Sequence, residues 1–346
     1  MGDFAFITGG LGLIGSMIAR KLAENNIVDK VVCLDHYGRY VSSLRKDFTD
    51  YRKYRLEGIE EKVIIERAEA KYPILMTKLL TKYRPRFIFH LAALPLAKID
   101  NLNAEEAIEG SVLSTTNILE SCGVLKYNLG YEPERFVYAS SSMVYGDFLY
   151  VPADENHPTN PKELYGTMKL AGEVITRGLS NFYGIKFSII RPSAVFGPTD
   201  MNRRVSQIFL DKAIAGEVIT INGEDEALDF TFVEDTAMGF ILAATNPEGI
   251  GETFNITYGK AHTLLQYVEE LKKFFPNLQY KVVERDAFRP KRGTLSINKA
   301  KKLLGYKPVF SLAEGVRQHV EFAKKHNPAY VFASKIRRQV TSIKEH

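Results

Sequence analysis

Short apolar runs alternate with longer amphipathic stretches through the first half of the chain. The runs are rich in Val, Ile and Phe, and the stretches between them have helical periodicity. This alternation predicts a parallel sheet with helices on both faces, which is a doubly wound, Rossmann-type α/β fold. Strands are expected at 4–8, 30–35, 62–67, 87–93, 135–141 and 186–193, and helices at about 13–25, 75–83, 103–123 and 163–183.

After about residue 195 the alternation becomes irregular, with shorter apolar runs and longer polar connections. We therefore expect a smaller, interleaved C-terminal substrate domain. The predicted division assigns a dinucleotide-binding domain to 1–190 and 228–260, the substrate domain to 191–227 and 261–330, and a basic tail to 331–346.

Composition narrows the class of protein. The chain has 346 residues, 45% of them hydrophobic, and a formal net charge of +5. Such a mild charge does not indicate nucleic acid binding, and no run approaches the roughly 18 apolar residues of a membrane span. The N-terminus lacks a signal-peptide pattern, and Cys33 and Cys122 lack metal or redox spacing. We expect a cytoplasmic protein that binds neither nucleic acid, membrane nor metal.

Four glycines lie between an expected strand and an expected helix in DFAFITGGLGLIGSMIARKL (3–22). A helix N-terminus presents free N–H groups and partial positive charge, and a phosphate can reach it where no Cβ intervenes. Gly9, Gly12 and Gly15 have the spacing of a dinucleotide-binding turn, and Gly10 completes a literal G-x-G-x-x-G. A tight turn without a ligand is the simpler alternative.

Asp35 strengthens the dinucleotide interpretation. It closes the second expected strand, 20 residues after Gly15. An acid in this position accepts hydrogen bonds from the adenosine ribose of NAD and repels a 2′-phosphate. The sequence therefore favours NAD, although Arg39 and Arg45 leave NADP as an alternative.

Two further segments carry candidate chemistry, YASSSMVYG (138–146) and YGTMK (165–169). Tyr165 and Lys169 are four residues apart and share one helical face. A tyrosine needs its pKa lowered by about three units, or roughly 4 kcal/mol, to act as a base near pH 7. One ammonium at about 4 Å supplies on the order of 4 kcal/mol. The pair is therefore a credible base for removing a hydroxyl proton during hydride transfer.

Together these motifs resemble the extended short-chain dehydrogenase/reductase family, and within it the NAD-dependent nucleotide-sugar epimerase/dehydratase branch. The resemblance extends over nearly the whole chain and is specific for the family rather than for the substrate. Beside the glycines, Asp35 and Y-x-x-x-K, it rests on HLAA (90–93), SSSMVYG, RPSAVFGP (191–198) and FRPKRGTLSINKAKKLLGYKP (288–308).

The resemblance implies roles for individual residues. Ser141 matches the catalytic Ser/Thr, Tyr165 the proton-handling tyrosine and Lys169 the lysine that also holds the nicotinamide ribose. The acid near adenine matches Glu69 only loosely. The other residues implied to contact NAD are Gly9, Gly12, Leu13, Ile14, Gly15, Asp35, Ala92, Ala93 and Ser140.

The two residues directly after the catalytic serine distinguish the branches of the family. Dehydratases carry Asp-Glu there and decarboxylases keep a Glu, but this chain has Ser142 and Met143. A thioether carries no transferable proton. The resemblance therefore implies a C4-epimerase of a nucleotide-diphosphate sugar. A net 4-dehydrogenase, a small-alcohol or amino-acid dehydrogenase and a non-catalytic NAD sensor remain as alternatives.

Two residues depart from the family pattern, since Leu228 stands where an Arg commonly meets the diphosphate and Ala194 replaces a common Asn. The substrate contacts are therefore expected from Ser142, Met143, Asn202, Arg203, Arg204, Arg289 and Arg292. The family resemblance also implies a homodimer in which the helices at 103–123 and 163–183 pair across a two-fold axis. Candidate positions for that seam are Leu170, Val174 and Leu179.

Overall fold

The computed structural model describes residues 2–36, 50–93, 104–202, 204–328 and 330–331. The predictions for Arg39, Arg45, Arg203 and the basic tail beyond residue 331 lie outside these ranges. Within them, no helix combines the length and the apolar character that a membrane crossing requires.

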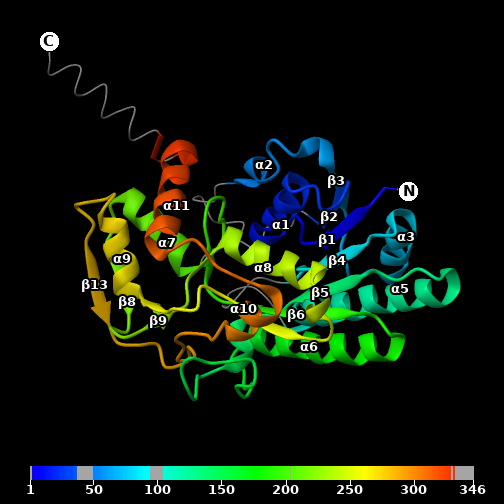
Figure 1. The fold of residues 1–346 in the computed structure, drawn as a ribbon. Coiled ribbons are helices and arrows are strands. Elements are labelled where there is room, and N and C mark those ends of the chain that lie inside the picture. The colour runs from blue at the N-terminus through cyan, green and yellow to red at the C-terminus, as the bar shows by residue number, and fades with distance from the viewer. Residues whose placement is uncertain (1, 37–49, 94–103, 203, 329, 332–346) are drawn as a thin grey trace, which may run out of the picture.

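A seven-stranded, all-parallel sheet forms the centre of the larger unit, as predicted (Figure 1). Its order is β3-β2-β1-β4-β5-β6-β11, so the direction of winding reverses between β1 and β4. Ligands of such folds bind outside the carboxyl ends of the strands at this reversal. The strands are β1 (Phe4–Thr8), β2 (Lys30–Asp35), β3 (Val63–Arg67), β4 (Phe87–His90), β5 (Arg135–Ala139), β6 (Phe187–Pro192) and β11 (Thr253–Ile256).

Two groups of helices cover the two faces of this sheet (Figure 1). Because alternate residues of a strand point to opposite faces, Ala5 and Ile7 join one core and Phe6 joins the other. Full burial of an aromatic side chain such as Phe6 contributes about 1.5–3 kcal/mol. The first face packs against α1 (Leu13–Glu24), α8 (Val233–Thr245) and α10 (Asn298–Leu304), and the second against α3 (Pro73–Tyr83), α5 (Ser114–Leu129) and α6 (Leu164–Tyr183).

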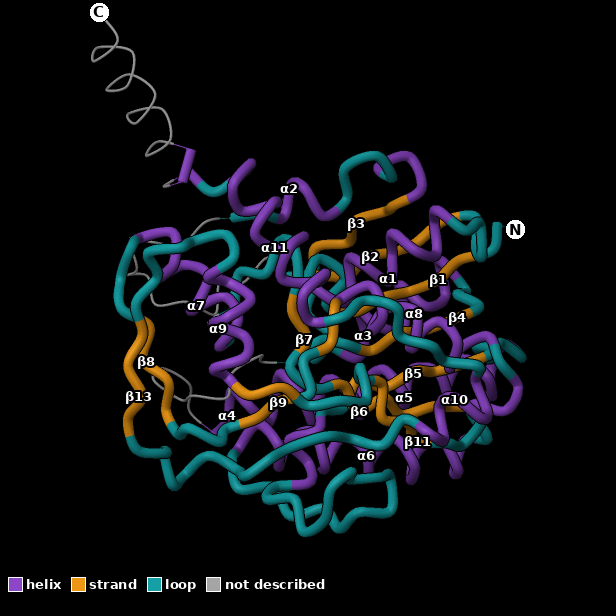
Figure 2. The backbone as a smooth tube through the Cα atoms, turned by 60° about the vertical axis from the view of Figure 1, so that its left-hand side comes forward, coloured by secondary structure: helices purple, strands orange, loops and turns teal. Residues whose placement is uncertain are grey.

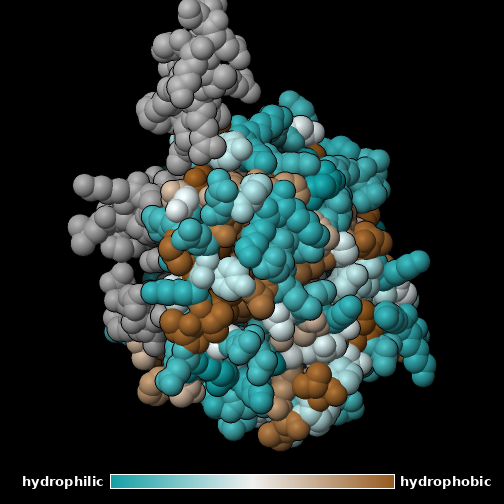
Figure 3. Space-filling model, turned by 90° about the vertical axis from the view of Figure 1, so that its left-hand side faces the viewer, coloured by the Kyte–Doolittle hydropathy of each residue, from teal (hydrophilic) through white to brown (hydrophobic). Residues whose placement is uncertain are grey.

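A smaller unit with its own core lies beside the sheet (Figures 1 and 2). It contains α7 (Val205–Ala215), α9 (Leu264–Lys272), α11 (Leu312–His326) and three two-stranded pairs. The pairs are β8 (Ile219–Asn222) with β13 (Tyr280–Val283), β9 (Ala227–Leu228) with β12 (His262–Thr263), and β7 (Val195–Phe196) with β10 (Thr231–Phe232). The outward face of this unit is mostly hydrophilic, with separate apolar patches (Figure 3).

Helix α10 packs differently from what the predicted division suggests. Its residues Ala300 and Leu304 join the core of the sheet rather than that of the smaller unit. The domain boundaries themselves remain a prediction.

Local chemistry explains where several helices begin and end. A capping box starts α9, because Gln266 N–H donates to Thr263 Oγ1 at 3.1 Å and Thr263 N–H donates to Gln266 Oε1 at 2.8 Å. Helix α6 ends at Gly184, whose φ of +65° suits glycine. These signals are readable in the sequence, and α6 lies within one residue of its predicted bounds.

Some boundaries differ from the predicted ones. The strand expected at 87–93 ends at His90, because the Ala92 N–H turns back to Thr8 Oγ1 at 3.1 Å instead of extending the ladder. The helix expected at 103–123 continues to Leu129, after a short helix α4 (Ala104–Ala107) and a π-helical turn at Ile108–Leu113. In the polar region after β2, the described part contains the short helix α2 (Arg52–Arg55).

Candidate active site

The glycine-rich turn joins β1 to α1 at the point where the sheet order reverses. A Cβ at Gly10 would lie 2.6 Å from the Cβ of Cys33, and one at Gly15 would lie 2.3 Å from the Gly9 carbonyl oxygen. Neither position therefore admits a side chain without backbone movement. Gly9 itself has a φ of +69°.

The N-terminus of α1 is open for an anion. No side chain caps Gly12, and the first turn carries no acidic residue. A Cβ at Gly12 would meet only the Gly9 oxygen, at 3.0 Å. Leu13 and Ile14 begin the helix behind this turn. The bare N–H groups and the small cradle fit the pyrophosphate of a dinucleotide.

Asp35 lies beside this turn and orients it. Its Oδ2 accepts the Leu11 N–H at 3.1 Å, which places the carboxylate at the end of β2 next to the glycines. Ala92 and Ala93 follow β4 on the other side of β1. Glu69, the loosely matched adenine contact, is 40% exposed and pairs with Lys71 at 3.2 Å. The contacts of these residues with NAD stay predictions.

His90 lies beside the end of β1, and the sequence analysis gave it no role of its own, only a place in the HLAA motif. It is buried, and its Nδ1 lies 2.7 Å from Thr8 Oγ1 and its Nε2 lies 3.1 Å from Thr115 Oγ1. Burial, aided by the positive charge of Lys169, lowers the pKa of His90 to about 3. A neutral imidazole thus joins the end of β1 to helix α5.

The end of β5 and the start of α6 bring the predicted catalytic residues together. Ser141 follows β5, and its Oγ accepts the Met143 N–H at 3.2 Å. Tyr165 and Lys169 lie on the first turns of α6, and the Lys169 Nζ is 5.8 Å from the centre of the Tyr165 ring. A Cβ on Gly166 would lie 2.6 Å from the Met143 oxygen, so this glycine lets α6 approach the serine turn. The Ser141 side chain lowers the pKa of Tyr165, which places the two hydroxyl groups near one another.

The electrostatics of the pair differ from the sequence expectation. Burial raises the pKa of Tyr165, while the charge of Arg204 and the hydrogen bond to Ser141 oppose this rise. Burial lowers the pKa of Lys169 to about 7, against the influence of Glu173. Lys169 donates to the Ala139 carbonyl at 2.6 Å rather than to the tyrosine oxygen. Among the residues that the structure describes, the cation that favours the tyrosinate is therefore Arg204.

A buried ion pair lies behind the catalytic serine. Arg191 donates to Glu173 through Nε at 2.8 Å and Nη2 at 2.7 Å, and both residues are at least 96% buried. Ser140 Oγ donates to the same carboxylate at 2.5 Å. The Ser140 side chain, predicted to contact the cofactor, is thus engaged in this network. Sequence reasoning missed Glu173, although its position four residues after Lys169 was a usable signal.

Two of the predicted substrate arginines lie close to the catalytic residues. Arg292 Nη1 lies 3.4 Å from the Met143 sulfur, and among the described atoms its buried Nε has no hydrogen-bond partner. Arg204 donates to the Val195 carbonyl at 3.0 Å and influences Tyr165. Arg289, in contrast, is 45% exposed and pairs with Asp286 at 3.4 Å.

The remaining substrate-side positions have backbone or core contacts. Ser142 is buried beneath the turn, and the Asn202 N–H donates to Asp200 Oδ1 at 3.0 Å. Leu228 lies in the core of the smaller unit. The neighbouring Asp229 accepts hydrogen bonds from Thr257 Oγ1 and two backbone N–H groups, and burial raises its pKa to about 6.

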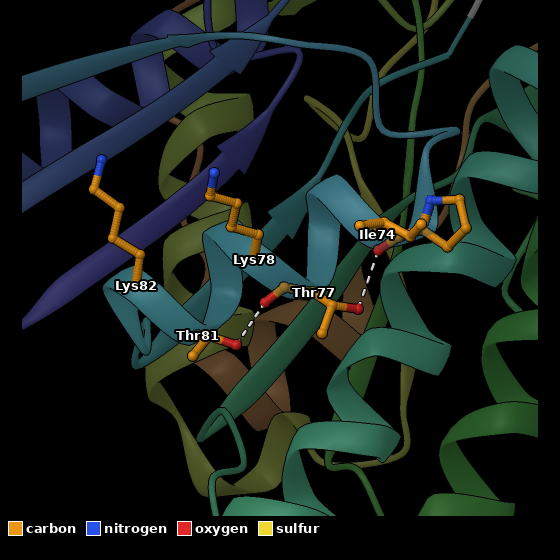
Figure 4. Close-up of a pocket in the computed structure, with 6 residues that line it drawn as sticks. Ile74, Thr77, Lys78, Thr81 and Lys82 are labelled. Atoms are coloured by element: carbon orange, nitrogen blue, oxygen red, sulfur yellow. Dashed lines mark hydrogen bonds between the residues drawn. The ribbon is translucent and has the colours of Figure 1, made fainter.

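A surface hollow on α3 is separate from this constellation (Figure 4). Thr77 and Thr81 in its wall donate to carbonyls of their own helix, at 3.0 and 2.7 Å. None of the predicted catalytic residues lines it. Its lining is Pro73, Ile74, Thr77, Lys78, Thr81 and Lys82.

Comparison with known proteins finds relatives that match this chain along nearly its whole length. The chain is 29% identical over 330 residues to UDP-glucose 4-epimerase of Mycolicibacterium smegmatis, covering 91% of this chain and 97% of that protein. It is 27% identical to dTDP-glucose 4,6-dehydratase of Neisseria gonorrhoeae, covering 91% and 94%. The crystal structure of UDP-glucose 4-epimerase from Thermotoga maritima superimposes with a TM-score of 0.79 at 26% identity, covering 93% and 99%.

Residues 5–257 match the model of the NAD dependent epimerase/dehydratase family. This match includes the glycine turn, Asp35 and the Ser141, Tyr165 and Lys169 set. The cofactor is therefore NAD, and the cradle at the N-terminus of α1 fits it. By sequence, fold and site geometry, the chain is an enzyme that belongs to the NAD-dependent epimerase/dehydratase family.

Proposed function

We propose that this enzyme is a nucleotide-sugar 4-epimerase that transiently oxidises a sugar hydroxyl. The observation that carries the proposal is the arrangement of Ser141, Tyr165 and Lys169 beside Met143. The set supports oxidation of an alcohol, and the thioether offers no acid or base for a further step. The similarity to two UDP-glucose 4-epimerases supports the same substrate class.

In the proposed reaction, Tyr165 removes the proton of the sugar hydroxyl, and Ser141 holds the hydroxyl oxygen. Bound NAD would supply the acceptor for the hydride of the same carbon. The charge of Arg204 and the side-chain interaction with Ser141 favour the charged form of the tyrosine against the effect of burial, and the Lys169 Nζ lies 5.8 Å from the centre of its ring. Return of the hydride to the opposite face of the keto sugar, with return of the proton from Tyr165, inverts the carbon.

Met143 separates the proposal from the dehydratase branch. Loss of water from the sugar requires an acid and a base near the catalytic serine. Ser142 is buried, and the Met143 sulfur faces Arg292 at 3.4 Å. The second candidate is a 4-dehydrogenase, in which the hydride is not returned and the 4-keto sugar is released. It needs the same three catalytic residues.

The diphosphate is proposed to bind Arg292 and Arg204. Both guanidinium groups lie near the catalytic residues, and the unpaired Nε of Arg292 suits an anionic partner. Arginine forks match the geometry of phosphate oxygens. Arg289, which is exposed, would join them only after leaving Asp286.

A homodimer through α5 and α6 is also proposed. Val174 and Phe182 on α6 are 63% and 79% exposed, and Tyr127 on α5 is 91% exposed. Leu179, by contrast, packs in its own core, so of the predicted seam Val174 is the residue that faces outward. A cytoplasmic location remains a proposal, supported by two free, buried cysteines.

A panel of UDP-, GDP-, dTDP- and CDP-linked sugars, followed by product NMR, tests the function. The expected result is one C4 epimer with no net NADH. A 4-keto sugar with equimolar NADH would support the dehydrogenase instead. A 4-keto-6-deoxy product at ordinary enzyme rates would overturn the proposal, because an unidentified residue would then handle the proton at C5.

A further inference from the structure

Arg55, on the short helix α2, is a buried cation between two loops that are far apart in sequence. It is 5% exposed. Its Nη1 donates to the carbonyl of Leu11, inside the glycine turn. Its Nη2 and Nε donate to the carbonyl and the Oγ1 of Thr199, at 2.6 and 3.2 Å. One guanidinium group therefore joins the cofactor turn to the loop that follows β7.

The backbone N–H and C=O of Leu11 are each held by a charged side chain. Asp35 accepts its N–H at 3.1 Å, and Arg55 donates to its C=O. Asp35, the proposed ribose ligand, and Arg55 thus fix the two peptide groups that flank Leu11, one toward Gly10 and the other toward Gly12. Displacement of Arg55 would alter the shape of the turn on which the pyrophosphate rests.

The loop at the other end of Arg55 is held in an unusual conformation. Thr199 has a φ of +68°, which a β-branched residue adopts only when its surroundings impose it. Both polar groups of Thr199 that Arg55 contacts supply this restraint. A second contact joins the start of α2 to this loop, because the Tyr51 N–H lies 3.1 Å from the Met201 sulfur.

This loop leads directly to the proposed substrate site. Arg204 lies five residues after Thr199, and its positive charge lowers the pKa of the predicted catalytic residue Tyr165. Burial lowers the pKa of Arg55 to about 10, against the influence of Asp200, Asp35 and Asp50, so the guanidinium is still a cation near neutral pH. Its hydrogen-bonding capacity is directed at protein carbonyls and a hydroxyl rather than at a ligand.

We infer that Arg55 is a positioning residue that couples the dinucleotide site to the nucleotide-sugar site. Ordering of the glycine turn by NAD orders the Thr199 loop through Arg55, so the second ligand meets a loop that is already fixed. By linkage, the nucleotide must then strengthen the binding of NAD by the same free energy. We expect this gain as slower dissociation of NAD, because most differences in affinity between related complexes lie in the dissociation rate. The inference rests on the proposed function, because it requires a nucleoside diphosphate at the second site.

The test measures exchange of bound NAD for labelled NAD in the holoenzyme, with and without a saturating nucleoside diphosphate. The probe is whichever of UDP, GDP, dTDP and CDP binds the wild-type holoenzyme by equilibrium dialysis. In the wild type, the probe should slow exchange at least about 5-fold, the lower end of usual coupling. In Arg55→Met, the slowing should fall below about 2-fold.

Three further variants separate coupling from simple loss of structure. Arg52→Met is the matched control, because Arg52 lies on the same helix and pairs with Asp50. The ratio of the NAD exchange rates without and with the nucleotide should be the same in this variant as in the wild type. Arg55→Lys keeps the charge without the planar fork and should give an intermediate ratio. Thr199→Val removes one acceptor, keeps the branched shape and should also lower the ratio, so the test survives if Arg55→Met fails to fold.

The outcomes distinguish this inference from the proposed function. NAD exchange in Arg55→Met that is faster than in the wild type, but is slowed by the nucleotide to the same extent, would show that Arg55 has only a structural role. This result would overturn the coupling. Absence of any slowing in the wild type would also overturn it. Failure of all four nucleotides to bind would instead remove the proposed function, and the coupling with it.

Discussion

The Lys169 ammonium donates to the Ala139 carbonyl oxygen at 2.6 Å, and this bond joins α6 to the end of β5 at the catalytic centre. The lysine is thereby fixed between the Tyr138 and Tyr165 rings, at 5.4 and 5.8 Å from their centres. The ammonium group therefore faces the Tyr165 ring, while its hydrogen bond goes to the backbone. The catalytic set therefore depends on the backbone of β5 as well as on its own side chains.

Replacement of Tyr165 by Phe should abolish proton transfer and leave the fold intact. General acid–base catalysis contributes about 10²–10⁴ in rate, so kcat should fall by at least that factor while NAD stays bound. Ser141→Ala should cost less, because it removes a positioning hydrogen bond. Steady-state kinetics and cofactor content after denaturation check both. A Ser141→Ala loss larger than that of Tyr165→Phe would contradict the assigned roles.

Asp35→Asn should narrow the preference for NAD over NADP by about tenfold. An amide oxygen can still accept the Leu11 N–H, but it no longer repels a 2′-phosphate, and a charged hydrogen bond is typically about 1.5–3 kcal/mol against about 1 for a neutral one. Dissociation constants for both cofactors provide the measurement. Equal affinities in the wild type would refute the assigned role of Asp35.

Burial of neutral His90 should make the protein sensitive to acid. Its pKa is about 3 when folded, below the usual 6.5, so between these values the unfolded chain binds more protons. Stability therefore rises with pH across this window and is lost as pH falls from 6 toward 4. In His90→Gln this slope should be shallower, by up to about 1.4 kcal/mol per pH unit. Urea unfolding at several pH values is the measurement, and parallel slopes would exclude the effect.

Loss of the buried Glu173 carboxylate should be strongly destabilising. Glu173→Gln leaves Arg191 as an uncompensated buried charge, which costs about 3–5 kcal/mol. The exposed pair Glu314–Arg317 provides the control, since loss of a solvent-screened ion pair in Glu314→Gln should change the free energy of unfolding much less. Chemical denaturation measures both. Similar losses for the two variants would show that the buried pair has no special importance.

Charges on the outer face of α6 should prevent dimer formation. Val174→Glu and Phe182→Glu place carboxylates at residues that are 63% and 79% exposed in the single chain. Such substitutions cost little within one subunit but would be buried in a seam. Sedimentation should give a dimer for the wild type and a monomer for the double variant. A wild-type monomer at micromolar concentration would contradict the proposal.

The sequence predicted those parts of the site that depend on local spacing. The glycine turn, Asp35 at the end of β2 and the Tyr165–Lys169 pair each follow from neighbours within one or two elements. The parallel sheet followed from the alternation of apolar runs and helices, and its observed order confirms the doubly wound class.

Interactions between distant segments could not be predicted in this way. Arg55 and Thr199 are 144 residues apart, and neither lies in a recognisable motif. Glu173 and Arg191 are separated by only 18 residues, but their pairing requires α6 and β6 to pack in register. The pKa of Tyr165 also depends on burial and on Arg204, which no spacing rule supplies.

The place of β11 in the sheet affects the order of events during protein synthesis. This edge strand pairs with β6, yet segments of the smaller unit, among them α7 and β8, are translated between the two. Until Thr253–Ile256 emerges from the ribosome, β6 presents its unpaired backbone groups as an open edge. Open strand edges are the surfaces at which chains associate wrongly. The nascent chain therefore passes through a period in which its central sheet can accept a strand from a neighbouring polypeptide.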